Sequence, residues 1–277
     1  RDIHFDYRMA IAAIENGADK IRINPGNITD PGAIRHLVEC AKTYGVPIRI
    51  GVNGGSLSAE VRRRFGEASA MALVASAMEN IRLLEAEHFY EIAVSVKSSD
   101  VRTMIEAYRL LRMQCDYPLH LGVTEAGTAE IGVVKNAVGI GTLLLEGIGD
   151  TVRVSLTGDP VQEVFAAQNI LRSVGLYTVG VEVISCPMCA RTKIPLERIV
   201  AEVKAATKHI RTPIKAAVMG CVVNGPGEAK DADIGLAGGG GNGEKAVVFR
   251  KGEMLASGGI AQMTQLLIRE IIKMADT

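Results

Sequence analysis

Residues 47–53, Pro-Ile-Arg-Ile-Gly-Val-Asn, and residues 91–97, Glu-Ile-Ala-Val-Ser-Val-Lys, are two β-like runs, and residues 58–87 between them follow a helical pattern. A strand, a helix and a second strand in this order predict two parallel strands joined by a right-handed crossover. The same unit recurs throughout the first part of the chain. Further β-like runs lie at 2–5, 19–24, 118–125 and 149–156, and further helical patterns at 6–16, 31–44, 100–114, 129–146 and 160–174. We therefore expect six βα units in an α/β sheet or barrel, whereas a closed barrel of the commonest type has eight.

The pattern changes near Gly175. The second part contains β-like runs at 177–184, 214–223, 232–237 and 245–250 and helical patterns at 196–209 and 259–274. We therefore expect two domains, a larger α/β domain over 1–175 and a smaller α+β domain over 176–277. The glycine run at 238–241 predicts a loose hairpin or connector, because it lacks the Lys-Ser/Thr of a P-loop and opens no helix.

Composition excludes several classes of partner. The 277 residues carry 31 basic and 31 acidic side chains, so no global field attracts nucleic acid or an anionic membrane. Aromatic residues make up 4% and tryptophan is absent, which leaves few platforms for stacking bases. The uncharged stretches at 136–145 and 216–227 are far shorter than the ~20 residues of a membrane span. The five cysteines are an odd number, which favours a reducing compartment over a disulfide framework, and no export signal opens the chain. We therefore expect a cytoplasmic protein that binds neither nucleic acid nor membranes.

Polar side chains recur on one face of the predicted strands, because successive side chains alternate between faces. This polar lane comprises His4, Arg22, Asn24, Arg49, Gly51, Asn53, Ser95, Lys97, His120, Thr124, Arg153 and Ser155. The aliphatic face suits packing against helices, so we expect the polar lane to point into the barrel. Cations buried there need an anion or water, and arginine matches phosphate geometry, so a multiply charged anionic ligand is predicted.

Two further readings bear on the same strands. The alternative, an antiparallel sheet with its polar face in solvent, conflicts with the alternation of strands and helices.

Glu125 lies at a strand tip, out of register with the polar lane, and is a candidate acid or base or a partner for one of the cations.

Three cysteines form a second constellation. Cys186 and Cys189 have the spacing that lets two thiolates ligate one metal centre, and Cys221 follows on another predicted strand. A structural zinc needs a fourth ligand, and His209 lies in a predicted helix. A thioredoxin-type dithiol leaves Cys221 unused. Zinc and a four-iron cluster with three thiolates remain equally supported by spacing.

Eight motifs resemble those of the 4-hydroxy-3-methylbut-2-enyl diphosphate synthase family of the non-mevalonate isoprenoid pathway, and the resemblance runs from residue 1 to about 260. The motifs are Asp2-Ile-His-Phe-Asp-Tyr-Arg8, Arg22-Ile-Asn-Pro-Gly-Asn27, Arg49-Ile-Gly-Val-Asn53, Val94-Ser-Val-Lys97, His120-Leu-Gly-Val-Thr-Glu-Ala-Gly127, Gly147-Ile-Gly-Asp-Thr-Val-Arg-Val-Ser155, Cys186-Pro-Met-Cys189 and Gly220-Cys-Val-Val-Asn-Gly-Pro-Gly-Glu228.

The resemblance implies a TIM barrel, of the (β/α)8 type, followed by an α+β iron–sulfur domain like a sulfite-reductase module, in the bacterial two-domain form. It also implies an N-terminally incomplete barrel, because the family carries about two further βα units before the stretch matching Asp2. Substrate ligands in those units are absent from this chain.

The implied reaction is the two-electron reductive opening of 2-C-methyl-D-erythritol 2,4-cyclodiphosphate with loss of water. A [4Fe–4S] cluster on Cys186, Cys189, Cys221 and Glu228 is implied, with Glu125 as proton donor. Electrons come from a flavodoxin or ferredoxin, and a homodimer shares the active site between subunits. The implied substrate-binding residues are His4, Arg22, Asn24, Arg49, Asn53, Lys97, Arg153 and Ser155. The rival hypothesis is a non-catalytic phosphate-binding barrel with a structural zinc module.

Overall fold

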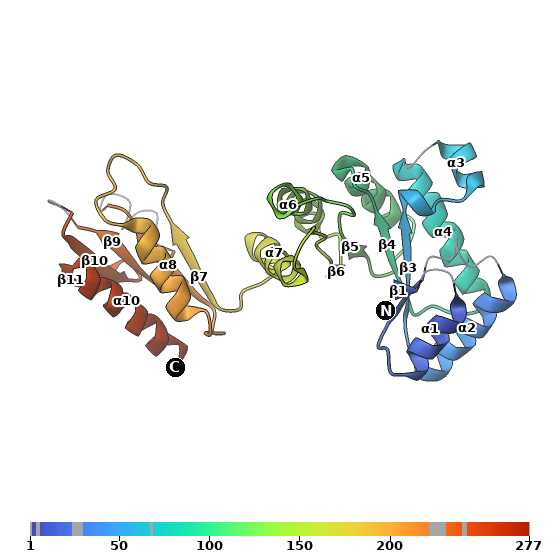
Figure 1. Ribbon diagram of the computed structural model, residues 1–277, viewed down its shortest axis with the longest axis horizontal. Coiled ribbons are helices and arrows are strands. Elements are labelled where there is room, and N and C mark those ends of the chain that lie inside the picture. The colour runs from blue at the N-terminus through green and yellow to red at the C-terminus, as the bar shows by residue number, and fades with distance from the viewer. Residues whose placement is uncertain are drawn as a thin grey trace. The chain divides into compact units, whose positions relative to one another are not determined.

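Strands and helices alternate along the first part of the chain (Figure 1). The computed structural model describes residues 2–3, 6–23, 30–66, 69–221, 231–239 and 243–276, and the chain divides into the units Arg1–Tyr177 and Thr178–Thr277. The elements of the first unit are β1 (Asp2–Ile3), α1 (Tyr7–Glu15), β2 (Ile21–Ile23), α2 (Pro31–Tyr44), β3 (Ile48–Asn53), the 3₁₀ turn η2 (Gly54–Ser56), α3 (Ala59–Phe65), α4 (Ala70–Ala86), β4 (Ile92–Lys97), α5 (Val101–Arg112), β5 (His120–Leu121), α6 (Ala129–Leu145), β6 (Thr151–Val152) and α7 (Pro160–Ser173).

The strands of this unit are parallel and follow the order of the chain. Strands β1 to β4 form one sheet, β5 and β6 form a second pair, and a parallel bridge between Val94 and Leu119 joins the two. All six predicted strands are therefore present, and the antiparallel alternative is wrong. Strands β5 and β6 have two residues each and are shorter than predicted.

The aliphatic face of the strands forms the core of this unit. Ile21, Ile23, Ile48 and Ile50 have no exposed surface, and α4 packs against β3 and β4 (Figure 1). The helical pattern over 58–87 corresponds to two separate helices, α3 and α4. The hydroxyl of Ser69 accepts a hydrogen bond from the backbone N–H of Ala72 and caps α4, which explains why a new helix begins there.

Tyr108 of α5 connects the two sheets at their junction. Its side chain is fully buried, its hydroxyl donates to the carbonyl oxygen of His120 at 2.6 Å, and it accepts from the backbone N–H of Val96 at 3.2 Å. Burial raises the pKa of Tyr108, so the hydroxyl stays protonated and able to donate. One side chain thus satisfies a donor on β4 and an acceptor on β5, where backbone pairing between the strands is sparse.

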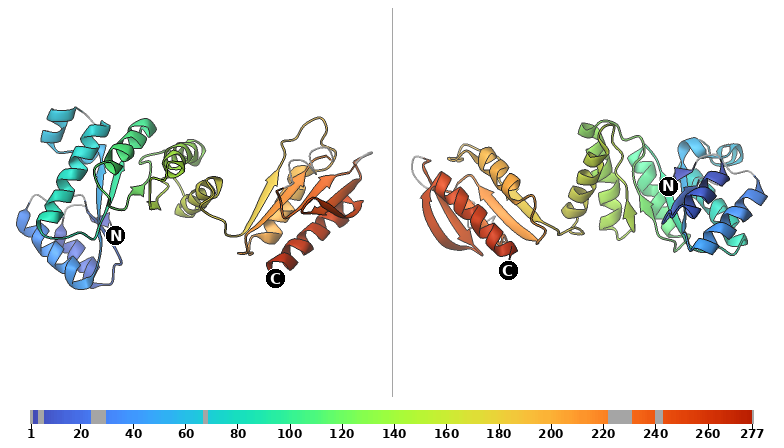
Figure 2. Two further views of the ribbon diagram at one scale, coloured as in Figure 1. Left: turned by 180° about the vertical axis from the view of Figure 1, so that it is seen from behind. Right: turned by 60° about the horizontal axis from the view of Figure 1, so that its bottom comes forward.

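The second unit is a five-stranded sheet with two helices on one face (Figure 2). Its elements are β7 (Val181–Ser185), α8 (Leu196–Thr207), β8 (Ile214–Met219), β9 (Ile234–Gly238), β10 (Lys245–Arg250), β11 (Glu253–Gly259) and α10 (Ile260–Ala275). Strands β7, β8 and β9 are parallel, and β10 pairs antiparallel with β9, as in a hairpin. Residues 240 and 241 of the glycine run at 238–241, the predicted hairpin or connector, lie outside the described residues.

The edge strand β11 was not expected from the sequence. It follows β10 through a two-residue turn, Lys251 and Gly252, whose φ angles are 48° and 85°. Two-residue turns with positive φ match the twist of the flanking strands and favour a hairpin. The turn is the signal that identifies β11.

We predict that Tyr108→Phe lowers the free energy of unfolding of the first unit by about 1–3 kcal/mol, because it leaves a buried donor and a buried acceptor without a partner. Urea unfolding followed by circular dichroism measures the change. Tyr44→Phe is the matched control, because Tyr44 is 54% exposed, and its effect is expected within about 0.5 kcal/mol. Equal effects of the two substitutions would contradict the role of Tyr108.

Candidate functional site: a cationic cavity and a cysteine cluster

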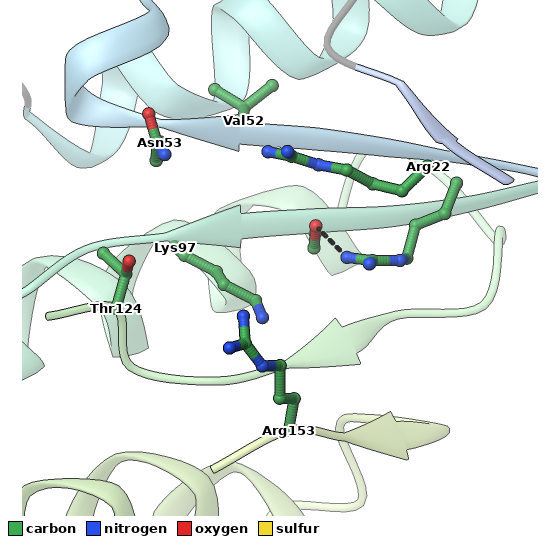
Figure 3. Close-up of a pocket in the computed structure, with 8 residues that line it drawn as sticks. Arg22, Val52, Asn53, Lys97, Thr124 and Arg153 are labelled. Carbon is green, nitrogen blue, oxygen red and sulfur yellow. Dashed lines mark hydrogen bonds between the residues drawn. The ribbon is translucent and has the colours of Figure 1, made fainter. Parts of the chain in front are cut away.

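A cavity of about 270 Å³ lies on the polar face of the strands of the first unit (Figure 3). The described residues that line it are Arg22, Arg49, Val52, Asn53, Ser95, Lys97, Thr124 and Arg153. Five of these are substrate-binding candidates from the sequence. None of the described lining residues is acidic, and four carry a positive charge, so the cavity suits an anion with several charges.

Backbone and side-chain hydrogen bonds hold two of the guanidinium groups in place. Arg22 Nη2 donates to the carbonyl oxygen of Gly51 at 3.1 Å. Arg49 Nη1 donates to the hydroxyl of Ser95 at 3.2 Å, the dashed line in Figure 3, and that hydroxyl donates to the carbonyl oxygen of Ile50 at 3.2 Å. Both arginines are thus oriented by the sheet without a ligand, which reduces the entropy lost when an anion binds.

Lys97 and Arg153 approach the cavity from opposite sides. The Lys97 side chain extends from the end of β4, the Arg153 side chain from the segment after β6, and their charged ends point toward one another (Figure 3). The two positive charges repel each other, whereas an anion bound between them attracts both. Lysine acts as a point charge for phosphate and arginine as a planar fork, so the pair fits a phosphate group.

Two glycines leave room for the cations. A Cβ atom at Gly51 would overlap the Arg22 guanidinium, with Nη2 at 2.8 Å and Cζ at 2.9 Å. A Cβ atom at Gly122 would lie 2.5 Å from the carbonyl oxygen of Arg153 and 3.1 Å from Lys97 Nζ. Gly51 belongs to the predicted polar lane but was not a predicted site residue, and neither was Gly122. The signal was a glycine within a strand, which often marks a close approach.

The other predicted site residues differ in how the structure places them. Ser155 and Glu125 are not among the described lining residues. The backbone carbonyl oxygen of Ser155 accepts a hydrogen bond from Nδ2 of the fully buried Asn136 at 3.3 Å, and Glu125 is exposed at a positive φ of 52°. His4, Asn24 and Glu228 lie outside the described residues. Ser95 and Thr124 belong to the polar lane and line the cavity, although sequence reasoning did not select them as ligands.

His120 is not among the described residues that line the cavity. Its Nδ1 is 2.8 Å from the hydroxyl of Thr151, and its Nε2 is buried with no hydrogen-bond partner among the described residues. Burial and the positive charges of Lys97 and Arg49 lower the pKa of His120 to about 3. The ring is therefore neutral at physiological pH.

The three cysteines of the second unit are arranged around Gly220. Cys186 directly follows β7, and its Sγ accepts a hydrogen bond from the backbone N–H of Gly220 at 3.2 Å. Thr192 packs against Gly220, and its hydroxyl lies 4.0 Å from Cys189 Sγ. Cys221 is the next residue after Gly220. A hydrogen bond from the backbone N–H of Arg191 lowers the pKa of Cys189 and favours its thiolate.

The three cysteines are of the ligand type that binds soft metal centres. Thiolates are the ligands of zinc and of iron–sulfur clusters, and hydrogen bonds from N–H groups to the sulfurs are typical of cluster sites. Among the described residues, however, no group of three or more His, Cys, Asp or Glu side chains lies close enough together to hold a metal ion. The donor set therefore fits the predicted group, whereas the complete ligand geometry is not formed by the described residues.

The fold and the site define the class: a protein with a parallel α/β unit that carries a cationic cavity, and a second, α+β unit that carries three cysteines. The family described as "GcpE TIM-barrel domain" matches residues 1–168, and that described as "GcpE protein C-terminal domain" matches residues 182–273. The chain belongs to the GcpE family.

Three relatives show how far the similarity extends, and each is named 4-hydroxy-3-methylbut-2-en-1-yl diphosphate synthase (flavodoxin). The protein of Caldanaerobacter subterraneus subsp. tengcongensis is 57% identical over 273 residues, covering 99% of this chain and 76% of the relative. Those of Clostridium perfringens and Thermodesulfovibrio yellowstonii are 52% and 50% identical over 276 and 272 residues, covering 100% and 98% of this chain and 77% of each relative. Within the part of the chain that the structure describes, no helix has the length and apolar character of a membrane span.

We predict that Gly51→Ala weakens the binding of inorganic pyrophosphate about tenfold, because the added methyl group displaces the Arg22 guanidinium and a hydrogen bond to a charged group is lost. Isothermal titration calorimetry measures the affinity. Gly141→Ala on α6 is the control: its Cβ would meet only Val174 Cγ1, at 4.0 Å, and alanine is favoured in helices. Unchanged affinity in Gly51→Ala would show that the Arg22 position does not matter for anion binding.

Proposed function

We propose that this protein catalyses the reductive opening and dehydration of 2-C-methyl-D-erythritol 2,4-cyclodiphosphate to 4-hydroxy-3-methylbut-2-enyl diphosphate in isoprenoid biosynthesis. The observation that carries the proposal is the cavity lined by Arg22, Arg49, Lys97 and Arg153, whose charge suits a cyclic diphosphate. Relatives with 50–57% identity over nearly the whole chain are named as synthases of this product. The rival function, a non-catalytic phosphate-binding barrel with structural zinc, is not favoured by these names.

The cations of the cavity bind and orient the diphosphate in this proposal. Arg22 and Arg49, which the sheet orients at the cavity, donate to the phosphate oxygens, while Lys97 and Arg153 neutralise the phosphate oxygens between them. Asn53 supplies an uncharged donor at the end of β3. Ser155, Asn24 and His4 are proposed as further ligands from the family resemblance.

The reaction also needs protons, because the substrate takes up two electrons and loses a hydroxyl group as water. We assign proton donation to Glu125. Its support is its position next to the cavity-lining Thr124, on an exposed turn that follows β5. A carboxylic acid at the carboxyl end of a barrel strand is placed where TIM-barrel enzymes carry their catalytic groups.

For the second unit we propose a [4Fe–4S] module of the sulfite-reductase type. Cys186, Cys189 and Cys221 would hold the cluster, with Glu228 as a weaker oxygen ligand and a second catalytic residue. When bound, the cluster would pass electrons one at a time from the external donor to the substrate. The N–H group of Gly220 on Cys186 Sγ and the lowered pKa of Cys189 support thiolate ligation, because only the thiolate binds metal.

The partners follow from the same proposal. The relatives' names specify flavodoxin, and we propose flavodoxin or a ferredoxin as the electron donor for this chain. We further propose a cytoplasmic homodimer in which the active site is shared between subunits, supported by the family resemblance.

The substrate assignment predicts that Arg49→Ala weakens binding of the cyclic diphosphate at least about tenfold, since a hydrogen bond to a charged group contributes roughly 1.5–3 kcal/mol. Calorimetry measures the affinity, and the visible spectrum of the bound cluster should not change. Arg82→Ala, which removes an exposed arginine on α4, should bind the substrate like the unaltered protein. If Arg49→Ala retains full affinity, the cavity is not the substrate site.

The cluster assignment predicts iron and labile sulfide in near-equal amounts in protein purified without oxygen, with absorbance near 400 nm. Cys221→Ser should lose both elements, whereas Cys40→Ser, a cysteine of α2 in the first unit, should keep them. Iron and sulfide assays on the three proteins test this. Stoichiometric zinc without sulfide would support the structural zinc module instead.

A further inference from the structure

His120 occupies the polar face of the strands at the level of Ser95. Because Val94 pairs with Leu119 in a parallel bridge, the following residues, Ser95 and His120, lie at neighbouring positions on the opposite face. Ser95 lines the cavity and accepts a hydrogen bond from Arg49. His120 is thus next to the cavity wall without being one of the described residues that line it.

One nitrogen of the His120 ring has a hydrogen-bond partner, and the other has none among the described residues. Nδ1 contacts the hydroxyl of Thr151 at 2.8 Å, and the backbone oxygen of His120 accepts from Tyr108 at 2.6 Å. Nε2 is buried and has no partner among the described residues. A buried nitrogen without a hydrogen bond is costly, so a partner in the working protein is expected.

The charges that act on this ring are all positive. They come from Lys97 of β4, Arg49 of β3, Lys20 before β2 and Arg153 after β6, and the fully buried Tyr108 of α5 contributes a neutral hydroxyl. A lone pair facing cations is favoured over an N–H group facing them. We therefore expect Nδ1 to carry the proton and donate to Thr151, which leaves Nε2 as an acceptor.

Lys97 is the cation best placed to be the donor. A Cβ atom at Gly122 would lie 3.1 Å from Lys97 Nζ, so the ammonium group lies against Gly122. Gly122 directly follows β5 and is two residues from His120 in the sequence. Lys97 also exerts the largest of the charge effects on the ring.

We propose that His120 is a positioning residue of the cationic cavity, whose unprotonated Nε2 accepts a hydrogen bond from the ammonium group of Lys97, directly or through one ordered water. The bond aims the ammonium group at the anion without adding a further positive charge to the cavity. The inference rests on the proposed function only in requiring that the cavity binds a diphosphate group.

The first test is spectroscopic and uses the full chain labelled with ¹⁵N-histidine and inorganic pyrophosphate as the probe. We expect the His120 ring to show the Nδ1–H tautomer without titration between about pH 5 and 9, and its Nε2 signal to shift when pyrophosphate binds. His36, exposed on α2, is the internal control and should not respond to pyrophosphate. An Nε2–H tautomer, or no response of His120 to bound pyrophosphate, overturns the proposal.

The second test separates positioning from a general structural role. His120→Phe should weaken pyrophosphate binding about tenfold, and His120→Gln, which places an amide oxygen near the Nε2 position, should restore most of the affinity. In a Lys97→Met background, His120→Phe should have little further effect, because the two residues act through one bond. Additive losses, or equal losses in the Phe and Gln variants, overturn it.

The pyrophosphate measurements do not depend on the reaction. If the cyclic diphosphate fails to bind or react while the His120 results hold, the proposed function fails and the positioning role stands. If the cyclic diphosphate is converted while His120→Phe binds pyrophosphate normally, the positioning role fails alone.

Discussion

Repulsion between positive charges on one face of a parallel sheet is the constraint on which the first unit depends. Arg22, Arg49 and Lys97 belong to the neighbouring strands β2, β3 and β4, Arg153 follows β6, and all four line one cavity. The small residues Gly51 and Gly122 let the long side chains lie against the sheet, and the backbone oxygen of Gly51 holds the guanidinium of Arg22 in place. The remaining electrostatic cost falls when an anion binds, so binding and folding of this unit are linked.

The alternation of side chains along the strands was sufficient to predict most of the cavity. Arg22, Arg49 and Lys97 lie within strands, where a period of two determines the face of every residue. Ser155 and Glu125 lie beyond the strand ends, where this period no longer applies. Their directions depend on contacts that no local pattern contains, such as the hydrogen bond from the buried Asn136 to Ser155.

The errors in the predicted elements have a similar cause. A helical pattern over 58–87 does not distinguish one helix from two that follow each other, because both bury the same kind of residues. Strand β11 is glycine-rich and largely exposed, so it lacks the apolar alternation that indicates a strand. The cysteine spacing was equally compatible with zinc and iron. Gly220 contacts Cys186 and Thr192, which are distant in the sequence, so the spacing of the cysteines could not predict these contacts.

Backbone pairing between β4 and β5 is sparse, and the Tyr108 hydroxyl links the two strands at this junction. Lys97 belongs to β4 and Arg153 follows β6, so the two cations stand on opposite sides of this junction. Any separation of β4 from β5 moves the ammonium away from the guanidinium and enlarges the gap that a phosphate group must span. The Tyr108 phenol is not among the described residues that line the cavity, yet it joins the two strands on whose two sides Lys97 and Arg153 stand.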